Sequence, residues 1–177
     1  EFSCIESAIL LSISQPPKQR SQWLQKALDI AESTMDDRSK LWLSQLYLME
    51  GWQFFDVRKF DLALAGFKKA LAGPLGSANP AEIFSIKWSI GRALRAVNQV
   101  QEALDIQRGL LAELGASGGV NGYVYLEIGE CLQLLKEHDE ARTYFDLTYK
   151  QLSLNRWYAD NKGSELGRIQ DLSKKKY

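Results

Sequence analysis

The stretch Tyr47–Ala70, YLMEGWQFFDVRKFDLALAGFKKA, decides the fold that this sequence predicts. Apolar residues recur at three- and four-residue steps on both sides of a short polar break, which is the pattern of two amphipathic helices joined by a tight turn. The small and aromatic residues stand at fixed distances from Gly51: Phe54 three residues later, Ala63 twelve, Phe67 sixteen and Ala70 nineteen. The stretch therefore predicts one helical hairpin.

The same spacing recurs twice further along the chain. Gly91 follows Gly51 by 40 residues, and Gly129 follows Gly91 by 38. The four offsets reach Leu94, Ala103, Gln107 and Leu110 from the first of these two glycines, and Leu132, Ala141, Phe145 and Thr148 from the second. A hairpin of this kind leaves an apolar face that a neighbouring hairpin must cover, so the repeat predicts an all-α chain arranged as an α-solenoid.

Helix start and stop signals divide the chain into four hairpins and an end helix. Prolines open helices, and Asp and Asn cap them. The signals are Pro16-Pro17, Asp36 or Asp37 as an N-cap, Asn79-Pro80, and turns at Asn98-Gln99 and Glu137-His138. We expect hairpins over about residues 3–34, 38–72, 80–114 and 120–152. The segment over about 156–174 is expected to be a solvating end helix or the first half of another repeat.

Composition narrows the possible partners. The 22 basic residues balance 22 acidic ones, so no net field favours nucleic acid or an anionic membrane. No apolar run approaches the roughly 20 residues that span a bilayer, so no membrane insertion is expected. Cys4 and Cys131 are too far apart in sequence to form a metal-ligand motif, which favours a reduced, cytoplasmic setting. The opening Glu1-Phe2 resembles the remnant of a cloning site and predicts a piece of a longer protein.

The repeated hairpins resemble the tetratricopeptide repeat family, which is built from two-helix repeats with small residues where the helices meet. Gly51, Ala63, Phe67 and Ala70 match the family pattern best, whereas Gln107 and Thr148 stand where the family prefers an aromatic residue and an alanine. The spacing of 40 and 38 residues also exceeds the usual ~34. The resemblance is clear over about residues 38–153, and it implies a right-handed superhelix of antiparallel hairpins that serves as a protein-interaction scaffold.

The resemblance also implies where a partner would bind. In this family the first helix of each hairpin lines the concave surface, at positions six, three and two residues before the glycine and one, four and five after it. Trp, Tyr and Arg dominate interface energies, so these positions yield a candidate partner-binding set with two acidic neighbours. The set comprises Trp52, Phe55, Trp88, Arg92, Arg95, Tyr123, Glu127 and Glu130.

A structural interpretation of the same residues stays open. Arg92 and Arg95 can pair with Glu127 and Glu130 on the adjacent helix, while the two tryptophans can pack between repeats. The lysines and asparagines with which some family members grip a peptide carboxylate are absent from these positions.

Enzymatic chemistry finds little support in the sequence. The single histidine, His138, stands in a predicted turn, Cys131 falls on an apolar helix face, and the pair Asp36-Asp37 is explained as a helix cap. We therefore expect no catalytic residues, no metal and no cofactor.

The favoured function is a scaffold that binds a peptide or a helix of a partner protein in its concave groove. One alternative is a ligand- or peptide-sensing regulatory domain of a larger signalling protein, in which binding shifts the curvature of the solenoid. Another is self-assembly into a homo-oligomer through an exposed apolar end.

Overall fold

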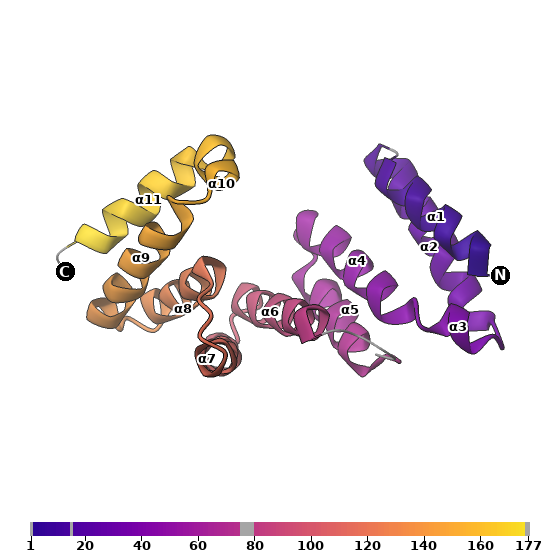
Figure 1. Cartoon of the computed structure of the whole chain (residues 1–177), viewed down its shortest axis with the longest axis horizontal. Coiled ribbons are helices and arrows are strands. Elements are labelled where there is room, and N and C mark those ends of the chain that lie inside the picture. Colours follow the sequence, from indigo (N-terminus) through magenta and orange to yellow (C-terminus); the bar gives the residue numbers. More distant parts are fainter. Residues whose placement is uncertain (1, 15, 75–79, 176–177) are drawn as a thin grey trace. The chain divides into compact units, whose positions relative to one another are not determined.

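The computed structural model describes residues 2–14, 16–74 and 80–175, and within them every regular element is an α-helix. The prediction of an all-α chain is confirmed for this part of the sequence. In chain order (Figure 1) the helices are α1 Phe2–Ser14, α2 Pro17–Ser33, α3 Asp37–Lys40, α4 Leu43–Asp56, α5 Phe60–Ala72, α6 Pro80–Ala96, α7 Val100–Ala116, α8 Gly122–Leu134, α9 His138–Leu152, α10 Arg156–Asn161 and α11 Gly163–Lys174.

The chain divides into two compact units, and the boundary falls near the end of α6. Unit 1 spans Glu1–Ala93 and unit 2 spans Leu94–Tyr177. In unit 1, α1 packs against α2 and α4 against α5; in unit 2, α8 packs against α9. These pairs are the first, second and fourth hairpins predicted from the sequence. A single right-handed solenoid running through both units stays a prediction.

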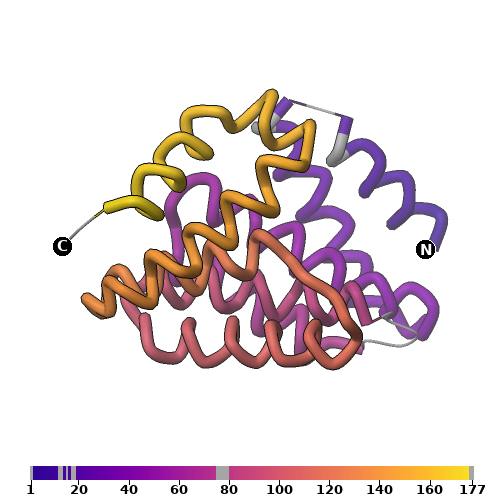
Figure 2. The backbone as a smooth tube through the Cα atoms, turned by 60° about the vertical axis from the view of Figure 1, so that its left-hand side comes forward, coloured from indigo at the N-terminus to yellow at the C-terminus, as the bar shows by residue number. Residues whose placement is uncertain are grey.

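Neighbouring hairpins meet through one recurring contact. The second helix of one hairpin packs against the first helix of the next, as α2 does on α4 and α7 does on α8. The same contact joins α9 to α11, which lie side by side near the C-terminal end of the chain (Figure 2). Each unit therefore extends its apolar core from hairpin to hairpin, as expected for a repeat.

A glycine lets the two helices of a hairpin approach closely. A Cβ atom added to Gly51 would lie 2.5 Å from the ring of Phe67, and one added to Gly129 would lie 3.0 Å from the ring of Phe145. Both rings are fully buried. On the facing helix α5, Gly66 lies close to the backbone of Gly51, so α4 and α5 meet with no side chain between them at this point.

The turns inside the hairpins share one conformation. Arg58, Asn98 and Lys136 each have a positive φ, between 62° and 66°, and each lies seven residues after its repeat glycine. The amide of the next residue donates to a carbonyl five residues back, as Glu137 N does to Leu132 O at 2.9 Å. This is the hydrogen bond of a Schellman motif, which usually places glycine at the left-handed position.

Three predicted features differ from the structure. The first helix of the hairpin expected over about 38–72 is interrupted at Leu41–Trp42, where the Trp42 amide donates to Ser39 O. The partly buried Trp42 packs there against the core of the first hairpin. The end segment forms two helices with a break at Lys162, and the predicted turn at Glu137-His138 lies slightly earlier, since His138 is the first residue of α9.

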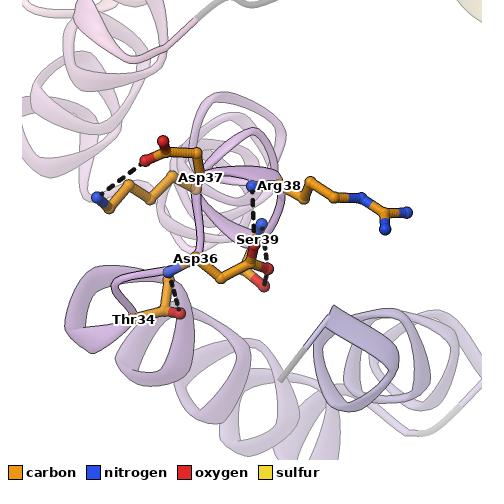
Figure 3. Close-up of polar contacts among 6 residues, drawn as sticks. Thr34, Asp36, Asp37, Arg38 and Ser39 are labelled. Carbon is orange, nitrogen blue, oxygen red and sulfur yellow. Dashed lines mark hydrogen bonds and ion pairs between the residues drawn. The ribbon is translucent and has the colours of Figure 1, made fainter.

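The predicted cap and helix-start residues are confirmed where the structure describes them. Asp36 caps α3 by accepting the amides of Arg38 at 3.3 Å and Ser39 at 3.1 Å, together with the Ser39 hydroxyl (Figure 3). These hydrogen bonds, led by that of the hydroxyl, lower the pKa of Asp36. Pro17 and Pro80 are the first residues of α2 and α6 as predicted, while Asn79 lies outside the described residues.

The left-handed turn position offers a test of the hairpin geometry. Lys136→Gly removes the strain of a side chain at positive φ and is expected to raise the free energy of unfolding by about 1 kcal/mol, measured by urea denaturation followed by circular dichroism. Lys68→Gly, on the exposed face of α5, is the control and is expected to lower the free energy of unfolding by about 1 kcal/mol. Equal destabilisation by both variants would contradict the turn conformation.

The glycine contact between α4 and α5 offers a second test. Gly51→Ala places a methyl group against the buried Phe67 ring, and overpacking of this kind costs about 1–3 kcal/mol. Alanine recovers about 1 kcal/mol of helix propensity, so we expect a net loss of stability in urea denaturation. Gly109→Ala in α7 is the matched control, because a Cβ there meets nothing within 4 Å, and it is expected to stabilise the chain. Stabilisation by both variants would show that the close approach is absent.

Candidate functional site

The eight predicted site residues divide between the two units, and each set is described by itself. Unit 1 holds Trp52 and Phe55 on α4 with Trp88 and Arg92 on α6. Unit 2 holds the remaining four, which are Arg95, Tyr123, Glu127 and Glu130.

In unit 1 the structure brings the predicted aromatic residues together. The ring centroid of Trp52 lies 5.4 Å from that of Phe55 and 5.9 Å from that of Trp88. Phe60, which the sequence analysis did not include, joins them with its centroid 5.0 Å from that of Phe55. We call Trp52, Phe55, Phe60 and Trp88 the aromatic cluster, and each of its four side chains is partly exposed.

Arg92 lies over this cluster. Its guanidinium carbon is 5.9 Å from the ring centroid of Trp52, 5.4 Å from that of Phe55 and 5.3 Å from that of Trp88. These are cation–π distances, and a planar guanidinium suits such stacking better than an ammonium group. Arg92 directly follows Gly91, and Trp52 directly follows Gly51, so equivalent positions of successive first helices contact one another. Both interpretations of the sequence receive support here, because the tryptophans pack together and still keep exposed surface.

The aromatic cluster also contacts the buried core between α4 and α5. The Trp52 ring centroid lies 5.1 Å from that of Phe67, the buried ring that packs on Gly51. The close approach of α4 and α5 therefore fixes where Trp52 can stand. Any change to that contact is expected to move the exposed surface with it.

In unit 2 an ion pair joins Arg95 to Glu127. The guanidinium donates from Nε to Oε2 at 2.8 Å and from Nη2 to Oε1 at 3.1 Å, and the Glu127 side chain is only 2% exposed. Burial opposes the charge on Arg95, but the carboxylate and its hydrogen bonds outweigh that effect and raise the pKa of the guanidinium. Arg95 on α6 and Glu127 on α8 thus form the kind of pair that the structural interpretation of the sequence expects.

The other two predicted residues of unit 2, Tyr123 and Glu130, contact the end helices α10 and α11. The Tyr123 ring centroid lies 5.8 Å from that of the buried Tyr158 in α10, and Glu130 accepts a hydrogen bond from Arg168 in α11. The sequence analysis missed Tyr158 and Arg168 as neighbours of the site. A signal for Arg168 was present, because Gly167 follows Gly129 by 38 residues and so continues the series of repeat glycines.

Unit 1 also contains a groove between α2 and α4 that the sequence analysis did not predict. Its volume is about 300 Å³. The lining residues are Ser21, Leu24, Gln25, Leu28, Glu50, Gln53, Phe54, Val57 and Lys59. Burial raises the pKa of Glu50, and the nearby Lys69 opposes this effect. Apolar side chains thus line the groove together with one acidic residue, Glu50, and one basic residue, Lys59.

Two of the residues considered for catalysis, Cys131 and Asp36, have contacts that are typical of structural residues. Cys131 is fully buried, and burial raises the pKa of its thiol to about 12, which disfavours the reactive thiolate. Asp36 serves as a helix cap. Among the described residues no cluster of three or more His, Cys, Asp or Glu side chains is arranged to hold a metal ion. No helix in the described part of the chain is long and apolar enough to cross a membrane.

Comparison with known proteins found no family model, no curated protein and no solved structure that matches this chain. The likeness to tetratricopeptide repeats therefore rests on the residues and spacings of the sequence itself.

The Arg95–Glu127 pair provides a test that separates a structural role from a binding role. Breaking a buried pair on one side costs about 3–5 kcal/mol, so Arg95→Met and Glu127→Leu are each expected to lower the free energy of unfolding substantially. The double variant is expected to cost much less than the sum, because neither charge is left buried alone. Urea denaturation of all four proteins measures the coupling, and additive losses would contradict a structural pair.

Proposed function

We propose that this chain is a protein-interaction module that binds a peptide or helix of a partner on the aromatic cluster of unit 1, with Arg92 as the charged contact. The observation that carries the proposal is the placement of a guanidinium over three partly exposed rings. Aromatic residues and arginine are the side chains most enriched at the energetic centres of interfaces.

The chemistry of the surface indicates what the bound segment contains. Partly exposed rings gain free energy when an apolar side chain covers them. The positive charge of Arg92 favours an acidic group beside that apolar side chain. The matching segment therefore carries an apolar side chain next to an acidic one.

The position of the cluster within the repeat supports the same conclusion. Trp88, Trp52 and Phe55 stand three residues before, one after and four after their repeat glycines. In the solenoid that we propose, these positions face the concave surface, and the first helices of successive hairpins line it together. An extended peptide or a single helix fits a surface of that kind.

Selection of peptides from a random library against the whole chain tests the proposal. We expect the recovered sequences to pair an acidic residue with an apolar one. Arg92→Glu is expected to weaken their affinity at least tenfold, since hot-spot changes cost about 2 kcal/mol or more. Affinity is measured by fluorescence anisotropy, and circular dichroism verifies the fold of each variant.

Arg20→Glu is the matched control for this experiment. Arg20 is exposed on α2, within the same unit and with the same change of charge. Its substitution is expected to leave the affinity within about twofold of the original. Peptides that bind Arg92→Glu as tightly as the unchanged chain would overturn the aromatic cluster as the binding site.

A further inference from the structure

The groove of unit 1 is built from matching faces of α2 and α4. Each helix contributes four residues at the spacing i, i+3, i+4 and i+7, which places them on one side of two successive turns. Because a helix rises about 1.5 Å per residue, these two turns make the groove about 10 Å long. The residues are Ser21, Leu24, Gln25 and Leu28 on α2, and Glu50, Gln53, Phe54 and the C-cap Val57 on α4, with Lys59 in the turn that follows.

The groove begins where the packed core between the two helices ends. The core of the first hairpin includes Leu46 of α4, and every other α4 residue that packs against it precedes Glu50. The Tyr47 hydroxyl donates to Glu32 near the end of α2 at 2.7 Å, so the two helices are antiparallel and in contact at this end. Beyond it they leave a volume of about 300 Å³, which is at the lower limit of small-molecule sites.

Apolar and hydrogen-bonding side chains alternate along the groove. Phe54 is half-buried and Val57 keeps 62% of its surface exposed, so an apolar ligand group can cover both side chains. Gln25 and Gln53 each add an amide with a carbonyl acceptor and two N–H donors. A ligand that fills the groove therefore carries apolar groups together with hydrogen-bonding groups along its length.

Opposite charges mark the two ends of the groove. Glu50 is the first lining residue along α4 and Lys59 follows the last, so the two are about two helical turns apart. Within the described residues no hydrogen bond reaches the Glu50 carboxylate. Burial raises the pKa of Glu50, Lys69 opposes this effect, and Glu32 adds to it. A ligand cation beside Glu50 would offset the loss of hydration of this carboxylate.

We propose that the groove between α2 and α4 binds a free peptide of about three residues, with its ammonium group at Glu50 and its carboxylate at Lys59. An extended chain spans about 3.3–3.6 Å per residue, so three residues match the length of the groove. A single amino acid is too short, because its two charged groups share one carbon atom. An aliphatic chain of the right length has no groups that pair with the amides of Gln25 and Gln53.

The groove and the aromatic cluster occupy different faces of α4. Relative to Gly51, the groove uses Glu50 one residue before and Gln53 two residues after, whereas the aromatic cluster uses Trp52 and Phe55, one and four residues after. With 3.6 residues per turn, these two sets point to nearly opposite sides of the helix. The peptide site is therefore independent of the function proposed for the aromatic cluster.

Trileucine with free termini is a suitable probe for the whole chain. We expect saturable shifts of the side-chain amide signals of Gln25 and Gln53 by NMR, and the titration gives the affinity. Acetylation of the amino end removes one charge from the probe, and amidation of the carboxyl end removes the other. Each change is expected to weaken binding at least tenfold. Equal binding of the free, acetylated and amidated forms would overturn the proposal.

Paired variants assign each end of the peptide. Glu50→Gln is expected to weaken binding of free trileucine at least tenfold and to leave the affinity for the acetylated form within about twofold. Lys59→Gln is expected to act in the same way on the free and amidated forms. Asp61→Asn and Lys68→Gln, exposed on α5 of the same unit, are the matched controls and are expected to change neither affinity. Equal losses for free and end-blocked peptides would contradict the assignment of the charges.

A steric variant tests the site without changing its charge. Gln25→Trp places an indole in the groove and is expected to weaken trileucine binding at least tenfold, whereas Gln22→Trp, exposed on α2 outside the groove, is expected to have no effect. Arg92→Glu, which tests the aromatic cluster, is expected to leave trileucine binding unchanged. Binding that is lost with Arg92→Glu and kept with Gln25→Trp would place the peptide on the aromatic cluster and overturn the groove as its site.

Discussion

The contact between a glycine of one helix and a phenylalanine ring of the next is the constraint on which the second and fourth hairpins depend. A Cβ atom would lie 2.5 Å from the Phe67 ring at Gly51 and 3.0 Å from the Phe145 ring at Gly129, so an added methyl group would press on a buried ring at both positions. The helix axes therefore approach closely and cannot slide past each other without a clash. This fixed register decides which residues of each first helix face the core and which face the neighbouring hairpin.

The side chains with the strongest claim to function follow from that register. Two contacts join residues that directly follow repeat glycines: Arg92 lies over the ring of Trp52, and Arg168 donates to Glu130. One geometric position thus holds an aromatic ring, a cation and a carboxylate in turn. A repeat of this kind can keep its fold while it changes the chemistry of its surface from one hairpin to the next.

Much of the fold could be predicted because its signals are local. The cap at Asp36 and the helix starts at Pro17 and Pro80 depend only on neighbouring residues, and the sequence shows them directly. The helix break at Trp42 depends on the tertiary packing of that ring against the first hairpin, which no local pattern reveals. The contacts of the two arginines could not be predicted for the same reason. Arg95 pairs with a carboxylate and Arg92 lies over aromatic rings, although both residues belong to one helix.

The glycines of α11 connect this register to the surfaces that it leaves open. A glycine inside an uncovered helix costs about 1 kcal/mol relative to alanine, because it loses more backbone freedom on folding. At Gly51 and Gly129 the packing of a buried ring offsets that cost. At Gly163 and Gly167 nothing within the described residues offsets it. The same holds for Gly109 and Gly115 in α7, so an open glycine marks exposed helix surface and not a packing contact.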